Sequence, residues 1–174
     1  MSMSRFIPGL ALLTCLCLAG TAMARPAPIT HKPIVAAKFY SGQWYEIART
    51  PMLLTRNCNA STTEYTLQAD GLVKVVDACF RNGKRVSIEG RGNFMDPGTN
   101  ARLRVRYNPL IIWNYWILDH DPAGQWFISS DPTFDKLFIY TRQPPTQDYL
   151  DQLLQRARNL GYDTSRLEYP TIAP

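Results

Sequence analysis

Eight short segments in which apolar and polar residues alternate, joined by brief turns, limit the folds open to this 174-residue chain more than any other feature. Alternation with a period of two is typical of strands that bury one face. The separators are rich in Gly, Pro, Asn and Asp, and Asn82-Gly83 is a strong two-residue hairpin signal. The pattern therefore predicts a meander of antiparallel strands at residues 42–49, 61–67, 72–80, 85–94, 102–107, 115–119, 126–129 and 137–140.

A meander of eight strands has two edges that must be protected. Closure into an up-and-down barrel removes both edges. A two-sheet sandwich is the alternative, but its strands usually exchange sheets through long connections, and no connection here is obviously long. We therefore expect an all-β fold, an eight-stranded antiparallel up-and-down barrel. The interior of such a barrel is either filled by side chains or holds one small ligand.

One helix is expected after the last strand, at residues 146–160. Thr146 suits the N-cap, Asp148 suits the positive end of the helix, and Gly161 suits its stop. A stripe of apolar residues along one face is typical of packing, so we expect the helix to lie on the barrel wall. The stripe consists of Leu150, Leu153, Leu154, Ala157 and Leu160.

Residues 1–24 have the features of a cleaved signal peptide. A cationic start is followed by an apolar stretch at residues 9–19 and by Ala22-Met23-Ala24, a small-x-small cleavage site. Export is therefore expected, to the periplasm in a Gram-negative source and to the outside otherwise. A lipoprotein signal needs a cysteine after a small residue; because Cys15 follows Thr14 and Cys17 follows Leu16, no lipid anchor is expected.

The mature chain divides into an N-terminal arm at residues 25–38, the barrel with its helix at residues 39–169 and a tail at residues 170–174. It keeps two cysteines, Cys58 and Cys79, and such a pair in an exported protein favours one disulfide. A reactive thiol and half of a metal site are the alternatives, and neither has a supporting neighbour. The cysteines lie opposite each other if the intervening turn is centred between Gln68 and Ala69. An odd-length turn makes the pair diagonal, which a bulge accommodates.

The net charge of the chain limits the kinds of partner that it can bind. The chain has 19 Lys and Arg against 14 Asp and Glu, a formal charge of +5. This excess favours approach to anionic membranes or ligands, but it is too diffuse to indicate nucleic-acid binding.

No residue pattern indicates catalysis or a cofactor. The chain lacks Gly-x-Ser-x-Gly, His-Glu-x-x-His and a phosphate loop. Its two histidines, His31 and His120, leave little room for a metal site, and neither a metal nor a cofactor is expected. His120 with Asp119, Asp121 and Ser129 suggests a triad, but acidic residues beside a turn are commonly turn formers. We therefore expect no enzyme.

Three ordered segments resemble the lipocalin family. GQWYEIA at residues 42–48, with Phe39 upstream, resembles its first-strand signature; YWILD at residues 115–119 resembles its sixth strand; and DKLFIYTR at residues 135–142 resembles its final-strand motif. The likeness covers residues 36–169 and is nearest to the bacterial lipocalins and the apolipoprotein D branch. It implies a calyx-shaped barrel that binds small hydrophobic molecules.

The resemblance also assigns a structural motif at one barrel end. It implies that Arg142 lies across the indole of Trp44, and that Gly42 lets a neighbouring segment pass close to it. These residues are expected to stabilise the fold rather than to bind ligand. The family often has Tyr after the Asp of its final motif, and this chain has Lys136 instead, which alters the expected cavity.

The family likeness sets which side chains face inward. It places Asp119 inside, and it leaves the arginines at 102, 104 and 106 outside, because burying three unpaired arginines would cost much free energy. Phe94 is also expected inside, and Gly90 and Gly92 either make room for a ligand or bend their strand. The expected cavity lining is Val73, Val75, Ile88, Leu103, Val105, Tyr107, Tyr115, Ile117, Lys136, Phe138 and Tyr140.

The sequence thus predicts an exported carrier of hydrophobic ligands, and the resemblance suggests fatty acids or lysophospholipids. One hypothesis is that Lys136 or a tyrosine binds the anionic head group of the ligand. The alternative is that the Lys136 side chain extends into solvent at the rim of the barrel. A lipid-modifying enzyme and a filled, partner-binding barrel are the alternatives. The loop at residues 110–113, LIIW, either packs on the core or makes transient contact with a membrane. Nothing in the sequence indicates the oligomeric state.

Overall fold

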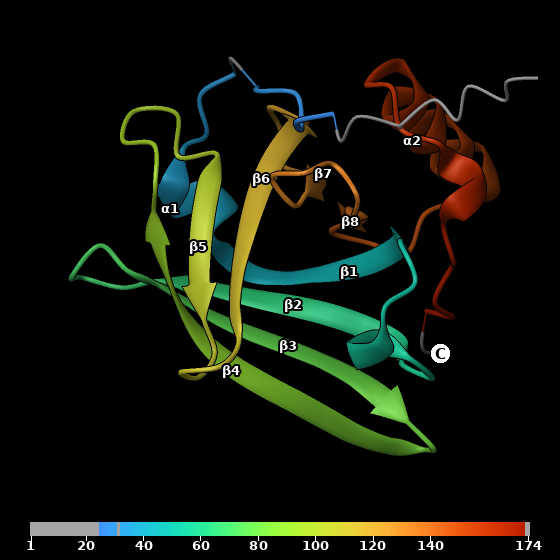
Figure 1. The fold of residues 1–174 in the computed structure, drawn as a ribbon, viewed down its shortest axis with the longest axis horizontal. Coiled ribbons are helices and arrows are strands. Elements are labelled where there is room, and N and C mark those ends of the chain that lie inside the picture. Colours follow the sequence, from blue (N-terminus) through green and yellow to red (C-terminus); the bar gives the residue numbers. More distant parts are fainter. Residues whose placement is uncertain (1–24, 31, 173–174) are drawn as a thin grey trace, which may run out of the picture.

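The computed structural model describes residues 25–30 and 32–172 and forms a closed antiparallel barrel (Figure 1). Each strand pairs with its sequence neighbour, and β8 closes the ring by pairing with β1. This confirms the predicted fold; the predicted signal peptide lies outside the described residues. The strands are β1 (Ser41–Arg49), β2 (Asn59–Leu67), β3 (Val73–Arg81), β4 (Lys84–Phe94), β5 (Arg102–Arg106), β6 (Ile112–His120), β7 (Trp126–Ser130) and β8 (Leu137–Thr141).

Strand β6 begins three residues earlier than predicted. Ile112 pairs with Arg106 and Trp113 pairs with Val105, so both belong to the strand rather than to a loop. Alternation alone missed this start because Ile111, Ile112 and Trp113 are successive apolar residues. The connection from β5 is correspondingly short.

The main helix is α2 (Gln147–Asn159), close to the predicted bounds. The hydroxyl of Thr146 caps it by accepting a hydrogen bond from the backbone N–H of Tyr149 at 3.4 Å. It ends before Gly161, whose φ of +92° suits a residue without a side chain. The shorter helical turns are α1 (Ala36–Phe39), η1 (Leu53–Thr55) and η2 (Thr164–Arg166). Within the described residues, no helix is long and apolar enough to cross a membrane.

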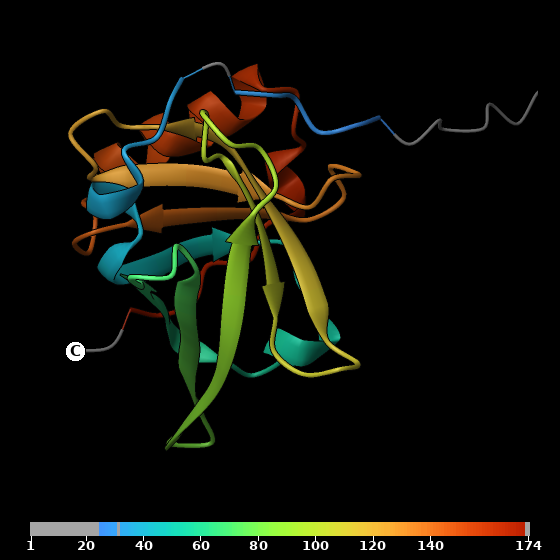
Figure 2. The same ribbon diagram turned by 90° about the vertical axis from the view of Figure 1, so that its left-hand side faces the viewer.

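Two separate apolar clusters stabilise the fold. The first lies between α2 and the outer face of the wall, where Leu153, Leu154 and Ala157 pack with residues such as Ile128 and Ile139. This places the predicted apolar stripe against the barrel, as Figures 1 and 2 show. The second cluster fills one end of the barrel interior with residues that include Phe39, Tyr40, Trp44, Phe127 and Leu103.

The motif residues lie at this closed end. Trp44 is fully buried, and its indole N–H donates to the carbonyl of Phe39 at 3.3 Å. The guanidinium carbon of Arg142 lies 3.6 Å from the centre of the Trp44 ring. Gly42 has a φ of +65°, and a Cβ there would come within 3.7 Å of the Arg142 guanidinium. That distance is an ordinary van der Waals contact, so the left-handed backbone is the reason for glycine at position 42.

A bulge in β6 reverses the direction of one predicted side chain. Ile117 pairs with Ser129, but Asp119 pairs with Ile128, so Leu118 is the extra residue. Leu118 packs under the helix, and the Asp119 carboxylate points outward to Lys32 at 2.5 Å and to Arg156 of α2 at 3.5 Å. The expectation that Asp119 faces inward was therefore wrong.

The predicted disulfide joins Cys58 to Cys79, with the two Cα atoms 5.4 Å apart. Residues 68–72 separate β2 from β3, an odd number, and the pairing shifts between Asn59 and Thr62. The cysteines are therefore diagonal partners beside a bulge, the second of the two geometries expected from the sequence. The bridge joins the start of β2 to the end of β3.

Candidate ligand cavity

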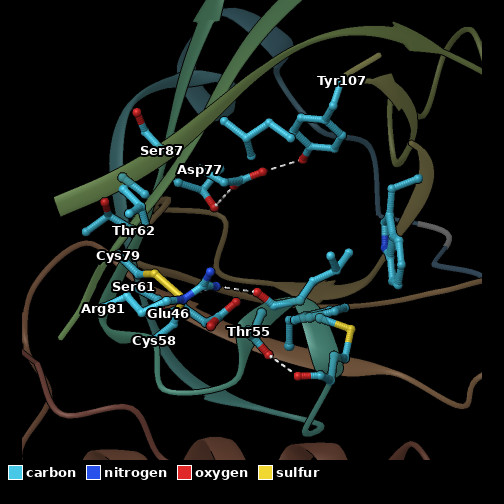
Figure 3. A pocket seen from close by; sticks show the side chains of 18 of the residues that line it. Glu46, Thr55, Cys58, Ser61, Thr62, Asp77, Cys79, Arg81, Ser87 and Tyr107 are labelled. Atoms are coloured by element: carbon cyan, nitrogen blue, oxygen red, sulfur yellow. Dashed lines mark hydrogen bonds between the residues drawn. A yellow bond between two sulfur atoms is a disulfide. The ribbon is translucent and has the colours of Figure 1, made fainter. Parts of the chain in front are cut away.

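A cavity of about 330 Å³ occupies the half of the barrel interior that lies away from the buried Trp44. Its wall is mostly apolar and includes five residues from the predicted lining, namely Ile88, Tyr107, Tyr115, Phe138 and Tyr140. The exposed residues Leu54, Val86 and Ile88 also belong to the wall, so the cavity opens to solvent near η1 and the β3–β4 hairpin. Figure 3 shows this space with polar groups along one side.

Five other predicted lining residues face inward but lie beyond the cavity, in the closed-end core. They are Val73, Val75, Leu103, Val105 and Ile117, and all are almost completely buried. The aromatic rings of Tyr40, Trp44 and Phe127 pack among them and leave no space for a ligand there. The barrel is therefore filled at one end and hollow at the other.

Lys136 lies outside both the cavity lining and β8, which begins one residue later. Its backbone N–H donates to the carboxylate of Asp131 at 2.8 Å, and its ammonium group pairs with Asp135. The carboxylate of Asp131 thus organises the β7–β8 turn and fixes Lys136 within it. The structure accordingly places Lys136 where it has no contact with the cavity.

Gly90 and Gly92 make room for neighbouring side chains of β5. A Cβ on Gly90 would lie 2.7 Å from Val105 Cγ1 and 2.8 Å from Tyr107 Cδ1. A Cβ on Gly92 would lie 3.0 Å from Leu103. The two glycines therefore let the inward side chains of β5 lie flat against β4.

Asp77 is a polar wall residue that the sequence reasoning missed. Its carboxylate accepts hydrogen bonds from the Thr63 hydroxyl at 2.5 Å and from the Tyr107 hydroxyl (Figure 3). The Tyr107 and Tyr115 hydroxyls are 3.0 Å apart. Burial raises the pKa of Asp77, and the two donors only partly oppose this. Continuing the alternation of β3 inward from Val75 would have found Asp77.

Glu46 and Arg49 form a buried ion pair of 2.7 Å at the side of the cavity. Burial raises the pKa of Glu46, although Arg49 and the Tyr140 hydroxyl, which donates at 3.1 Å, act in the opposite direction. Arg49 also donates to Ser61 and Glu168 at 2.7 and 2.6 Å. Its guanidinium is thus held by protein groups, and Glu46 rather than Arg49 contributes to the cavity wall.

The residues that suggested a catalytic triad are not assembled. His120 is buried, with its ring nitrogens near the backbone oxygens of Asp121 and Lys32 at 3.3 and 3.4 Å. Asp119 points outward to its ion pairs. The Ser129 hydroxyl is buried without a hydrogen-bond partner among the described residues. This geometry offers no activated nucleophile.

The segment at residues 110–113 is divided between the cavity wall and the protein surface. Ile111 and Trp113 belong to the cavity wall, whereas the side chain of Leu110 is 95% exposed at the β5–β6 turn. Leu53 and Leu54 on η1 are also exposed, by 78% and 60%. Both segments lie at the same end of the barrel in Figures 1 and 2.

An eight-stranded barrel with an aromatic closed end and an apolar cavity at the other end defines a binding protein for small hydrophobic molecules. The family model described as a lipocalin-like domain matches residues 35–171, and the chain belongs to the lipocalin family. Temperature-induced lipocalin-1 of Arabidopsis thaliana is 34% identical over 138 residues, 74% of each chain. Outer membrane lipoprotein Blc of Escherichia coli is 29% identical over 167 residues, 93% of this chain and 94% of that protein.

The fold is also similar to that of solved structures. Insecticyanin from the tobacco hornworm Manduca sexta superimposes with a TM-score of 0.65 at 16% identity, over 86% of this chain and 85% of that one. At this identity, the likeness shows the barrel architecture alone.

Proposed function

We propose that this lipocalin is an exported carrier that binds fatty acids or lysophospholipids in its barrel cavity. The apolar wall formed by residues such as Ile88, Trp113 and Phe138 is the observation that carries the proposal. An apolar cleft with a few fixed polar groups is typical of a small-molecule site. The volume of about 330 Å³ is at the low end of the range for such sites, which favours a ligand with one acyl chain over a ligand with two.

Binding rather than catalysis is the activity that this geometry supports. The polar wall groups Asp77 and Glu46 are engaged by hydroxyl groups and by Arg49, and the candidate triad residues lie apart from the cavity. A wall of this kind holds a ligand in place without presenting a free nucleophile.

Export without a lipid anchor is the second part of the proposal. The bacterial relative is named an outer membrane lipoprotein, and this chain aligns along nearly all of it. Here the cysteines of the leader follow Thr14 and Leu16 rather than a small residue in a lipoprotein cleavage site. Intact mass of the protein from its native host tests this: the mature chain should begin at Arg25, and a diacylated N-terminal cysteine would contradict the proposal.

The exposed leucines at the cavity mouth support transient contact with a membrane, from which such a carrier takes its ligand. Exposed apolar groups of this kind mark contact sites. Replacing Leu53 and Leu110 together by Ser should reduce co-sedimentation with lipid vesicles. Ile29→Ser is the matched control because Ile29 is exposed. Its segment, residues 25–30, lies at the end of the molecule opposite η1 and the β5–β6 turn (Figure 1). Equal loss in the control would contradict a specific contact surface.

The ligand itself is tested by native mass spectrometry of the mature protein purified from its own compartment. The protein is then denatured, and any released molecule is identified. A mass excess that resolves to fatty acid or lysophospholipid is the expected result. A mass without any excess, unchanged after incubation with those lipids, would contradict the carrier function and favour partner binding.

A further inference from the structure

Arg81 is the one cationic residue among the described residues that form the cavity wall. It is the last residue of β3, and it lies on the same face of the strand as Asp77 and Cys79, which also line the cavity. Its position beside the β3–β4 turn places it at the mouth rather than at the base. The guanidinium of Arg81 therefore places a positive charge at the cavity mouth, where a ligand enters.

The guanidinium of Arg81 is held in place but keeps free donors. Nη2 donates to the backbone carbonyl of Leu54 at 2.7 Å and contacts the Cys58 sulfur at 3.4 Å (Figure 3). In the described part of the chain, Nη1 makes no hydrogen bond, Nε is buried without a partner, and no carboxylate lies within ion-pair distance. Arg49 differs because protein groups occupy its donors. The Nη1 group of Arg81 can thus donate to an incoming anion.

The position of Asp77 favours the same placement. Asp77 lies four residues before Arg81 on β3, so its carboxyl lines the cavity further from the β3–β4 hairpin that carries Arg81. An anionic group is disfavoured beside the Asp77 carboxyl and favoured beside a guanidinium, which binds carboxylate and phosphate through paired donors. Between these positions the wall is apolar, with Ile88, Trp113 and Phe138.

We infer that Arg81 binds the anionic head group of a single-chain amphiphile at the cavity mouth while the chain lies among the apolar wall residues. This inference rests on the proposed function and narrows its ligand class to carboxylate or phosphate monoanions and dianions with one hydrocarbon chain. It assigns to Arg81 the contact for which Lys136 was considered from the sequence.

The test is calorimetric titration of the delipidated mature protein with three ligands that share one chain: palmitate, hexadecyl phosphate and 1-hexadecanol. The variants are Arg81→Gln, Arg81→Lys and the matched control Lys84→Gln, since Lys84 pairs with Arg81 across the hairpin and is exposed. Arg81→Gln should weaken binding of an anionic ligand by about tenfold or more, the effect of one hydrogen bond between charged groups. Hexadecanol binding should change by no more than about twofold, as should all binding to Lys84→Gln.

Arg81→Lys keeps the charge without the planar fork and should lie between the parent and Arg81→Gln. An effect on palmitate alone identifies a carboxylate site, and an effect on both anions identifies a general anion site; either supports the inference. Equal weakening of all three ligands by Arg81→Gln would overturn it and assign Arg81 to holding η1. Equal binding of the alcohol and the anions by the parent would overturn it while leaving the carrier function intact. Failure of the parent to bind any of them would overturn the carrier function itself.

Discussion

Arg142 and Trp44 connect the last strand of the barrel to the first. The guanidinium carbon of Arg142, just after β8, lies 3.6 Å from the centre of the indole ring of Trp44 in β1. The same guanidinium donates to the carbonyl oxygens of Ser41 and Gln43 at 2.7 and 2.9 Å and to that of Phe39 at 3.2 Å. One side chain therefore satisfies backbone acceptors at the start of β1 and just before it while it covers the buried Trp44 ring.

Replacing Arg142 by Ala should lower the free energy of unfolding by about 2 kcal/mol, because the variant loses a cation–π contact and several hydrogen bonds from a charged group. Arg142→Lys keeps the charge but not the planar fork and should lose part of this amount. Urea unfolding measures both. Arg104→Ala is the control, since Arg104 is exposed on β5 and should change stability by no more than about 0.5 kcal/mol. Equal losses at positions 142 and 104 would contradict a role in closing the barrel.

The disulfide closes an interval of 21 residues between Cys58 and Cys79. Replacing both cysteines by Ser should lower stability by about 3 kcal/mol on a chain-entropy basis. Guanidinium unfolding of the variant should coincide with that of the reduced parent protein, because both lack the same constraint. A parent transition that does not move on reduction would show that the bridge contributes little.

The strands and the barrel could be predicted because their signals are local. Alternation and turn residues define each strand, and closure follows from the cost of unpaired edges. The direction of Asp119 could not be predicted in this way, because the bulge at Leu118 appears only in the pairing with β7. Lys136 was misplaced for a related reason: Asp131 holds it in a turn, and turn geometry interrupts alternation.

The depth of the cavity also depends on more than side-chain direction. Val73 and Leu103 point inward as expected, yet the rings of Tyr40 and Trp44 fill the space around them. Tyr40 follows α1, a four-residue turn too short to leave a periodic pattern in the sequence. Alternation predicts which side chains enter a barrel, but the volume that they leave empty depends on three-dimensional packing.

Gly90 offers a test of the packing between β4 and β5. Gly90→Ala should destabilise the protein by about 1–3 kcal/mol, because the new methyl group overlaps Val105 and the ring of Tyr107. Gly92→Ala should cost less, since the nearest Leu103 atoms are 3.0 Å away and belong to a flexible side chain. Thermal unfolding compares the two variants. A larger loss at position 92 would show that the β5 side chains pack differently from this arrangement.

Because Asp77 is buried, it should make the folded protein less stable as the pH rises. Burial raises its pKa above the ordinary value of 3.8, so the folded protein holds this proton to a higher pH than the unfolded chain does. The contribution of Asp77 to the free energy of unfolding is therefore greatest below pH 3.8 and falls as the pH rises through the raised pKa. Above that pKa, folding requires a buried carboxylate.

Asp77→Asn should accordingly become more stable relative to the parent as the pH rises. The amide cannot ionise, and like the protonated acid it offers one acceptor and a donor to Thr63 and Tyr107. Urea unfolding at about pH 4 and about pH 8 measures the difference in each case. Asp70→Asn removes a carboxyl from the exposed turn between the same two strands and controls for loss of one negative charge. If the advantage of Asp77→Asn stays constant or shrinks with rising pH, the carboxylate of Asp77 is stabilised by its hydroxyl donors rather than penalised by burial.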